Sequence, residues 1–366
     1  MKAATQFVAI CMTAAVMFAG CGGSDTSWVY EHEGERMSAG VYITYQMQTV
    51  DDALSRMHDE YHETNGTEHT PYEDFSYPED LKDSANEIVD GIILNDWVAQ
   101  KTAQYAKSYF VVQREAARLG IALSETDLTS LRTNVQSAWD SYSEELEKNG
   151  VSQASWLLYQ QNEILKSRLF DSLYGDSGER AVPDDEVKSI FSQDYVKADV
   201  LIIEKAIVDP EDEAFGVVNQ LRKDMAEGYL ARVKEGETIE AVEYDYRLQQ
   251  TSDENQSTIT MKTPGELSNI FYREDDLYYK IGLVEAVFDS KVGEAVLVET
   301  DNDFFLIIRK DILTDDPTDF ESYRATIVAT VKFDEFEQWL HSEADNISVN
   351  VNGAALTRYK MTNLQR

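Results

Sequence analysis

The chain has 366 residues and a formal net charge of −36, from 68 acidic and 32 basic side chains. This excess of acid excludes nucleic acid as a partner, because a phosphate backbone has to be neutralised by basic groups. Hydrophobic residues make up 43% of the chain, and a chain of this length and composition is sufficient for two or three packed domains.

The N-terminus predicts export. Residues 1–20, MKAATQFVAICMTAAVMFAG, combine one lysine, an apolar run and a small-residue end, as in a signal peptide. Phe18-Ala19-Gly20-Cys21 resembles the lipobox of bacterial lipoproteins, although leucine is usual where Phe18 stands. The resemblance implies lipidation of Cys21 and anchoring on the extracytoplasmic side of the membrane in the bacterial cell envelope. Residues 21–36 would then be a flexible tether. An ordinary secretory signal with an incidental cysteine is the alternative.

Apolar residues at helical spacing predict a helical part over residues 37–195. A polar, turn-rich segment at 58–80 predicts a surface loop after the first helix. The expected helices cover residues 38–57, 81–119, 124–148, 152–174 and 183–195.

The pattern changes at residue 196, where VKADVLIIEK predicts a short buried strand at 196–205. Residues 244–276 are polar and predict an irregular segment. The other expected elements are helices at 211–233, 238–243 and 320–343, an amphipathic stretch at 277–289, and strands at 295–300, 303–310 and 347–351. The predicted fold class is therefore α+β.

The order of several segments resembles the extracytoplasmic foldases of the PrsA and SurA type, in which a parvulin-type peptidyl-prolyl isomerase module is inserted into a helical chaperone lobe. The matching segments are VKADVLII at 196–203, PGEL at 264–267, VEAVFDSKVGE at 284–294 and FFLIIR at 304–309. The resemblance implies a chaperone lobe over 37–195 completed by 314–352, a parvulin-like domain over 196–313, and a tail at 353–366.

The histidines of a parvulin module are missing from the matching positions. The histidine of the first strand falls on Val200, and that of the last strand falls on Leu306, or on Phe305 if the register slips by one. Aliphatic side chains cannot stabilise a twisted amide by hydrogen bonds, and the barrier to be lowered is about 18–20 kcal/mol. We therefore predict a catalytically silent module, with an active parvulin-type isomerase as the alternative. The candidates for the degenerate cleft are Asp199, Val200, Tyr279, Leu283, Phe305 and Leu306.

The helical lobe is the part expected to bind partners, which the resemblance implies are unfolded or nascent secreted proteins. Such binding gains free energy by covering apolar side chains. The alternative is that the same aromatic residues belong to an ordinary core. The candidate residues are Trp97, Tyr105, Tyr109, Phe110, Trp139 and Trp156. The sequence predicts no cofactor and leaves open whether the chain forms a homodimer.

Two other functions are less well supported by the sequence. HDEYH at 58–62, with His69 following, invites a zinc-hydrolase interpretation. That motif needs glutamate directly after the first histidine, and Asp59 stands there, so no metal site is predicted. A solute-binding lipoprotein would need alternating βαβ units over most of its length, which the helical first 195 residues argue against.

Overall fold

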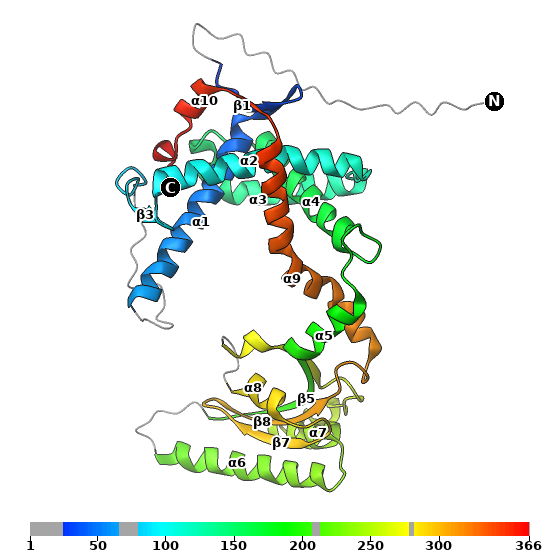
Figure 1. Ribbon diagram of the computed structural model, residues 1–366. Helices are drawn as coiled ribbons and strands as arrows, with labels where there is room; N and C mark the ends of the chain where they lie inside the picture. Colours follow the sequence, from blue (N-terminus) through cyan, green and yellow to red (C-terminus); the bar gives the residue numbers. More distant parts are fainter. Residues whose placement is uncertain (1–24, 66–79, 207–212, 278–281, 366) are drawn as a thin grey trace, which may run out of the picture. The chain divides into compact units, whose positions relative to one another are not determined.

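A computed structural model describes residues 25–65, 80–206, 213–277 and 282–365 (Figure 1). The predicted signal peptide and Cys21, as well as His69 and Tyr279, lie outside these residues. The chain divides into two compact units, and the described helices and strands confirm an α+β fold. The helical unit comprises the chain up to Leu169 together with Phe336 and everything after it, and the sheet unit comprises Phe170–Glu335. In the described part of the chain, no helix is both long and apolar enough to cross a bilayer.

Long helices make up most of the helical unit. They are α1 (Ala39–Asn65), α2 (Leu94–Arg118), α3 (Glu125–Lys148) and most of α4 (Gln153–Tyr174). The predicted start of α3 is confirmed, because Ser124 and Asp127 form a reciprocal capping box. The hydrogen bonds from Ser124 hold the pKa of Asp127 at about 2, well below its usual value.

Three short strands join the two ends of the chain in a small sheet. β1 (Trp28–His32) pairs with both β2 (Glu35–Ser38) and β9 (Asn350–Val351). The predicted tether at 21–36 is therefore wrong from Trp28 onward. The charges of these strands suggested a solvated tether, but Val29, Tyr30 and Met37 are buried.

The C-terminal tail predicted at 353–366 is also ordered. It forms α10 (Gly353–Arg358) and the 3-10 turn η3 (Met361–Asn363). Met361 is buried in a core cluster with Trp97 on α2 and Leu54 on α1. Leu364 packs against the same cluster, and Ala355 is also buried, so the tail is anchored by its few apolar side chains.

The boundaries of the first two helices differ from the prediction. α1 continues through 58–65, where a loop was expected, and the predicted helix at 81–119 begins only at Leu94. In front of Leu94, β3 (Ile88–Val89) and β4 (Ile92–Ile93) form a hairpin. Its turn is Asp90-Gly91, with φ of 50° and 75°. Positive φ at both positions is the geometry that Asp-Gly favours in a two-residue hairpin.

The sheet unit is built on a four-stranded antiparallel sheet in the order β6-β5-β8-β7. The predicted strands are confirmed as β5 (Tyr195–Glu204), β7 (Ala295–Glu299) and β8 (Asp303–Lys310). The segment predicted to be irregular at 244–276 contains the end of α7 and the edge strand β6 (Ser268–Tyr272). The other elements are α5 (Asp184–Asp194), α6 (Glu213–Lys234), α7 (Ile239–Gln250), η1 (Gln256–Thr258), η2 (Arg273–Leu277), α8 (Leu283–Asp289) and the first part of α9 (Pro317–Asn346).

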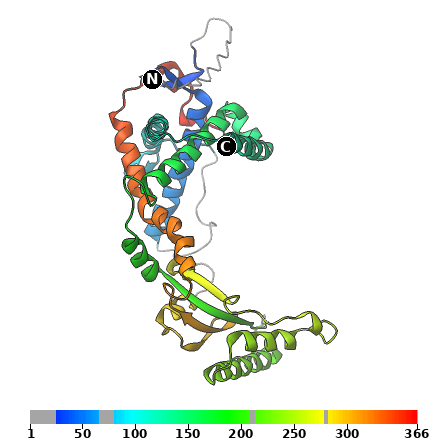
Figure 2. The ribbon, with the colours of Figure 1, turned by 90° about the vertical axis from the view of Figure 1, so that its right-hand side faces the viewer.

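Helices cover both faces of this sheet (Figures 1 and 2). α6 and α7 pack on one face, where Leu201 and Ile203 of β5 point. The short α8 packs on the other face, where Val200 points. Successive residues of a strand point to opposite faces, so the apolar run in β5 feeds two separate cores.

Candidate functional site

The α8 face of the sheet corresponds to the face on which the sequence places the parvulin cleft. Its cluster of buried apolar side chains is called here the α8 core. The side chain of Arg309, two residues after Ile307 on β8, also lies on this face, and its guanidinium donates to the carbonyl oxygens of Phe288 and Ser290. Val200 is 6% exposed and Phe305 is 3% exposed. The cluster comprises Val196, Ala198, Val200, Phe271, Leu283, Val284, Val287, Phe305 and Ile307. No member of this cluster can donate a hydrogen bond from its side chain.

The strand register decides between the two positions predicted for the last-strand residue. Val200 lies opposite Ile307, and Leu306 lies opposite Leu201. Leu306 therefore points into the core under α6 and α7. Its assignment to the same face as Val200 is wrong, and the alternative, Phe305, is the residue on that face. The motif match missed Ile307, the direct partner of Val200. Alternation along FFLIIR would have placed Phe305 and Ile307 together.

Asp199 does not face the α8 core. It precedes Val200 on β5, so its side chain points to the opposite face of the sheet. Lys310 Nζ lies 2.8 Å from one carboxylate oxygen of Asp199, and the Ser268 hydroxyl donates to the other. The hydrogen bond to Asp199 raises the pKa of Lys310. Asp199 is 2% exposed, and its partners account for that burial, so its suggested place in the cleft is wrong.

A second lysine, Lys197 of β5, lies near the Asp199–Lys310 pair. Lys197 lies opposite Lys310 in the β5–β8 ladder and is 6% exposed. Its Nζ atom lies 2.7 Å from Asp315 and 2.8 Å from Asp319. The buried Lys197 and the half-buried Lys310 thus have separate carboxylate partners, as buried charges require. We interpret this arrangement as structural.

The histidine motif forms no metal site in the described part of the chain. His58 lies within α1, with Nδ1 3.5 Å from the carboxylate of Asp59. The side chain of His62 and the whole of His69 lie outside the described residues. Among the residues described, no group of three or more histidine, cysteine or acidic side chains could hold a metal ion.

The six aromatic candidates for client binding differ in exposure. Trp97, Tyr109 and Phe110 are buried in the helical unit, with exposures of 9% or less. Tyr105 is half-buried, and its hydroxyl donates to Asp52 at 3.3 Å. Trp139 and Trp156, by contrast, pair across α3 and α4 with ring centroids 5.8 Å apart, and both remain half-exposed.

An exposed aromatic side chain lies one helical turn from this pair. Tyr142 is 58% exposed and follows Trp139 by three residues on α3, which places the two rings on the same side of that helix. We call Trp139, Tyr142 and Trp156 the α3–α4 aromatic patch.

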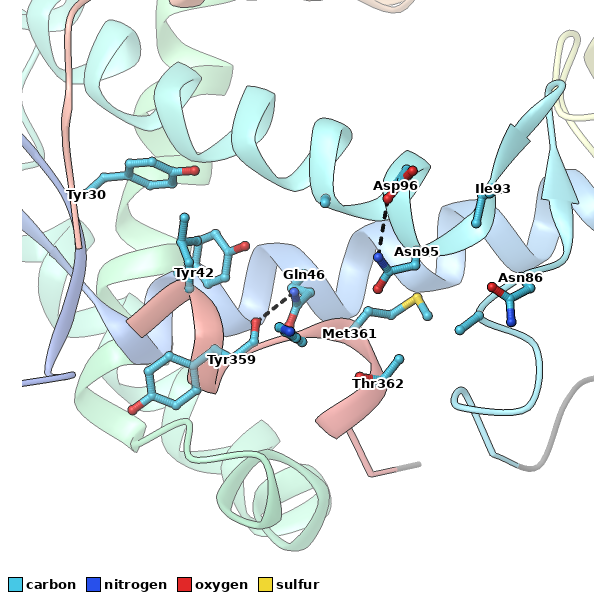
Figure 3. A pocket seen from close by; sticks show the side chains of 14 residues that line it. Tyr30, Tyr42, Gln46, Asn86, Ile93, Asn95, Asp96, Tyr359, Met361 and Thr362 are labelled. Carbon is cyan, nitrogen blue, oxygen red and sulfur yellow. Dashed lines mark hydrogen bonds between the residues drawn. The ribbon is translucent and has the colours of Figure 1, made fainter. Parts of the chain in front are cut away.

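A pocket that the sequence did not predict opens in the helical unit (Figure 3). Its volume is about 580 Å³. Tyr42 and Gln46 of α1 and Asp96 of α2 line it, together with Tyr30 of β1 and Tyr359 near the C-terminus. The rings of Tyr30 and Tyr42 meet edge to face, with centroids 5.9 Å apart. Burial raises the pKa of both tyrosines, so their hydroxyls are neutral at physiological pH.

No sequence motif could have identified this pocket. Tyr30 lies in the segment predicted to be a tether, and Tyr359 lies in the predicted tail. The two residues are more than 300 positions apart and line one pocket because β1 pairs with β9, which precedes α10 and Tyr359. Figure 3 shows Tyr30, Tyr42 and Gln46 gathered in the pocket.

Comparison with known proteins gives a likeness in fold. No family model matches the chain, and no curated protein matches it with significance. Solved structures of PrsA foldases are similar to it. The foldase from Streptococcus pneumoniae is 13% identical, with a TM-score of 0.34, and the match covers 72% of this chain and 90% of that chain. PrsA from Bacillus subtilis is 14% identical, with a TM-score of 0.32, over 76% and 98%. The Lactococcus lactis protein is 12% identical, with a TM-score of 0.34, over 92% and 99%.

Proposed function

We propose that this protein is an extracytoplasmic chaperone that holds unfolded secreted proteins, with a parvulin-like module that is catalytically silent. The order of the sequence motifs supports the family. The apolar side chains of Val200 and Phe305, which stand on the α8 face at the positions that match the parvulin histidines, support the silence, and this is the observation that carries the proposal. Prolyl isomerisation has no nucleophile, so catalysis depends on polar groups placed around the twisted amide. Val200, Phe305 and Ile307 supply none.

The client-binding surface belongs to the helical unit in this proposal. The α3–α4 aromatic patch offers two half-exposed aromatic rings and one exposed ring. Aromatic side chains of this kind bury large areas when they bind. The charge of −36 keeps a chain with exposed apolar side chains soluble, because like-charged molecules repel one another.

Two assays on the same preparation test the proposal. The chain from residue 22 onward is mixed with a denatured client, whose aggregation is followed by light scattering. A proline-containing peptide reports cis/trans isomerisation, with buffer and an active parvulin as references. We expect suppressed aggregation and an isomerisation rate equal to that of buffer. An isomerisation rate above buffer would contradict the silence, and unchanged aggregation would contradict the chaperone function.

Anchoring through Cys21 is tested in the full-length chain. Expressed in a bacterium, the wild type should incorporate a labelled fatty acid and partition into detergent. Cys21→Ala should lose both properties. Cys11→Ala, which changes the other cysteine of the chain, is the matched control and should retain them. Lipid labelling of Cys21→Ala would contradict the anchor.

A further inference from the structure

The pocket in Figure 3 contains a buried hydrogen-bond acceptor without a partner. Gln46 is 2% exposed. Its Nε2 atom donates to the carbonyl oxygen of Tyr359 at 3.1 Å. This contact fixes which end of the amide is which, because a carbonyl can only accept. Oε1 is left with no hydrogen-bond partner among the described residues. An unpaired buried acceptor destabilises the folded chain, so a ligand that donates to Oε1 recovers that free energy.

The walls beside Gln46 favour a cation among the possible donors. The rings of Tyr30 and Tyr42 line the same pocket as Gln46. A cation over the face of a tyrosine ring is attracted by the electron-rich face, more strongly when water is excluded. Burial raises the pKa of both phenols and keeps them neutral, so each attracts a cation through its ring and its hydroxyl oxygen.

The net charge of the protein also favours a cationic ligand. Asp96 lies exposed at the pocket, on the first turn of α2. Lys360 is the basic residue in the lining and offsets it locally. The net charge of −36 then decides the sign of the field that an approaching segment meets. Basic segments are attracted, and acidic ones are repelled.

We propose that this pocket binds the cationic head of an arginine or lysine side chain in an extended client segment. The head donates to Gln46 Oε1 and stacks against Tyr30 and Tyr42, while the client backbone lies across the opening near Asp96. The inference rests on the proposed chaperone function, because it names the class of client segment that the helical unit prefers. An arginine side chain suits the site, since it has five donors and no acceptor.

Fluorescence anisotropy with three labelled peptides tests this inference on the chain from residue 22 onward. The peptides are nine residues long and differ only at the central position, which is arginine, citrulline or alanine. Citrulline keeps the shape and several donors of arginine but has no charge. We expect the arginine peptide to bind at least about tenfold tighter than the citrulline peptide, with the preference falling as salt rises. Equal binding of arginine and citrulline would overturn the proposal.

Three variants locate the binding. Gln46→Met keeps the length of the side chain and removes the acceptor, and it should reduce the arginine preference to less than about twofold. Asp96→Asn changes an exposed residue and should weaken the arginine peptide alone. Thr102→Val is the matched control. Thr102 on α2 is buried and has an unpartnered side-chain oxygen, as Gln46 on α1 does, but Thr102 does not line the pocket. It should bind like the wild type.

The outcomes separate this inference from the proposed function. If Gln46→Met does not fold, Asp96→Asn and the citrulline peptide still decide the matter. Aggregation suppressed by the wild type, together with equal binding of the three peptides, would overturn the pocket and leave the chaperone function standing. Loss of the arginine preference in Thr102→Val would also overturn the pocket.

Discussion

Val200 on β5 lies directly opposite Ile307 on β8, and both side chains belong to the α8 core. At this place in the ladder, two facing side chains are close enough to act together. A valine and an isoleucine there can pack but cannot polarise an amide. The contacts that hold the sheet at this position therefore offer an amide no hydrogen bond.

A histidine introduced at this position should be costly. Val200→His places an imidazole among apolar side chains that offer no hydrogen bond, so we expect a loss of about 1–3 kcal/mol in unfolding free energy. Urea unfolding at pH 8, where histidine is neutral, measures the loss. Ile202→His is the matched control, since Ile202 points to the same face but is 42% exposed. It should cost less than about 0.5 kcal/mol. An equal loss in both variants would contradict the apolar description of the α8 core.

The Asp199–Lys310 pair should matter much more than an exposed pair of the same length. The two contacts are each 2.8 Å, but Asp199 is buried whereas Lys223 and Glu299 are exposed. We expect Asp199→Asn to cost about 3 kcal/mol, because Lys310 loses its carboxylate in a partly buried place. Lys223→Met should cost less than about 1 kcal/mol. Chemical unfolding of both variants at pH 7 compares the two costs.

The same pair predicts a dependence on alkaline pH. Asp199 raises the pKa of Lys310 in the folded state. The stabilisation is thus complete below the unfolded pKa of about 10.4 and is lost as the pH rises through the higher folded value. The wild type should therefore lose its advantage over Asp199→Asn only in strongly alkaline solution. A difference that already vanishes between pH 7 and pH 9 would contradict the assignment.

The elements that could be predicted are those whose signal is local. β5, β7 and β8 carry continuous apolar runs, and α3 carries its own capping box. The β3–β4 hairpin was missed, although Asp90-Gly91 between isoleucines and valine is a strong hairpin signal. It was overlooked because a proline-free helical pattern continued on one side. β1 and β9 had no such signal, since both are short and their pairing joins opposite ends of the chain.

The candidate site shows the same difference between residues with a local sequence signal and residues that only tertiary contacts bring together. Alternation within β5 and β8 gives Val200 and Phe305 once the strands are known, but a motif register alone placed Leu306 on the wrong face. Tyr30, Gln46 and Tyr359 could not be grouped in advance, because the contacts that gather them are tertiary. An unpartnered buried amide is visible only in a folded chain.

Glu163 should make the helical unit less stable at neutral pH than at mildly acidic pH. Burial is the main cause that raises its pKa, and nearby Glu337 adds to it, against Lys166 and a hydrogen bond from Tyr45. The folded state therefore binds the proton more tightly than the unfolded state. Stability rises as the pH falls through the folded pKa, and the gain is complete below the unfolded value of about 4.3.

Glu163→Gln isolates this contribution. Glutamine keeps an acceptor for the Tyr45 hydroxyl, which donates to Glu163 Oε1 at 3.2 Å. We expect the variant to be more stable than the wild type at pH 7, by no more than about 1 kcal/mol because the side chain is partly exposed. The difference should shrink toward pH 5. Thermal unfolding at both pH values measures it, and a variant less stable at pH 7 would contradict the stated cause.

The α3–α4 aromatic patch should contribute to client binding. Trp139→Ala removes one ring of the half-exposed pair, so the chain should suppress aggregation less well, with about a fivefold to tenfold higher concentration needed for half-maximal effect. Leu221→Ala is the matched control, because Leu221 is 61% exposed on α6 of the sheet unit. The control should act like the wild type. Impaired suppression by Leu221→Ala, with normal suppression by Trp139→Ala, would contradict this prediction. The client-binding surface would then lie on the sheet unit.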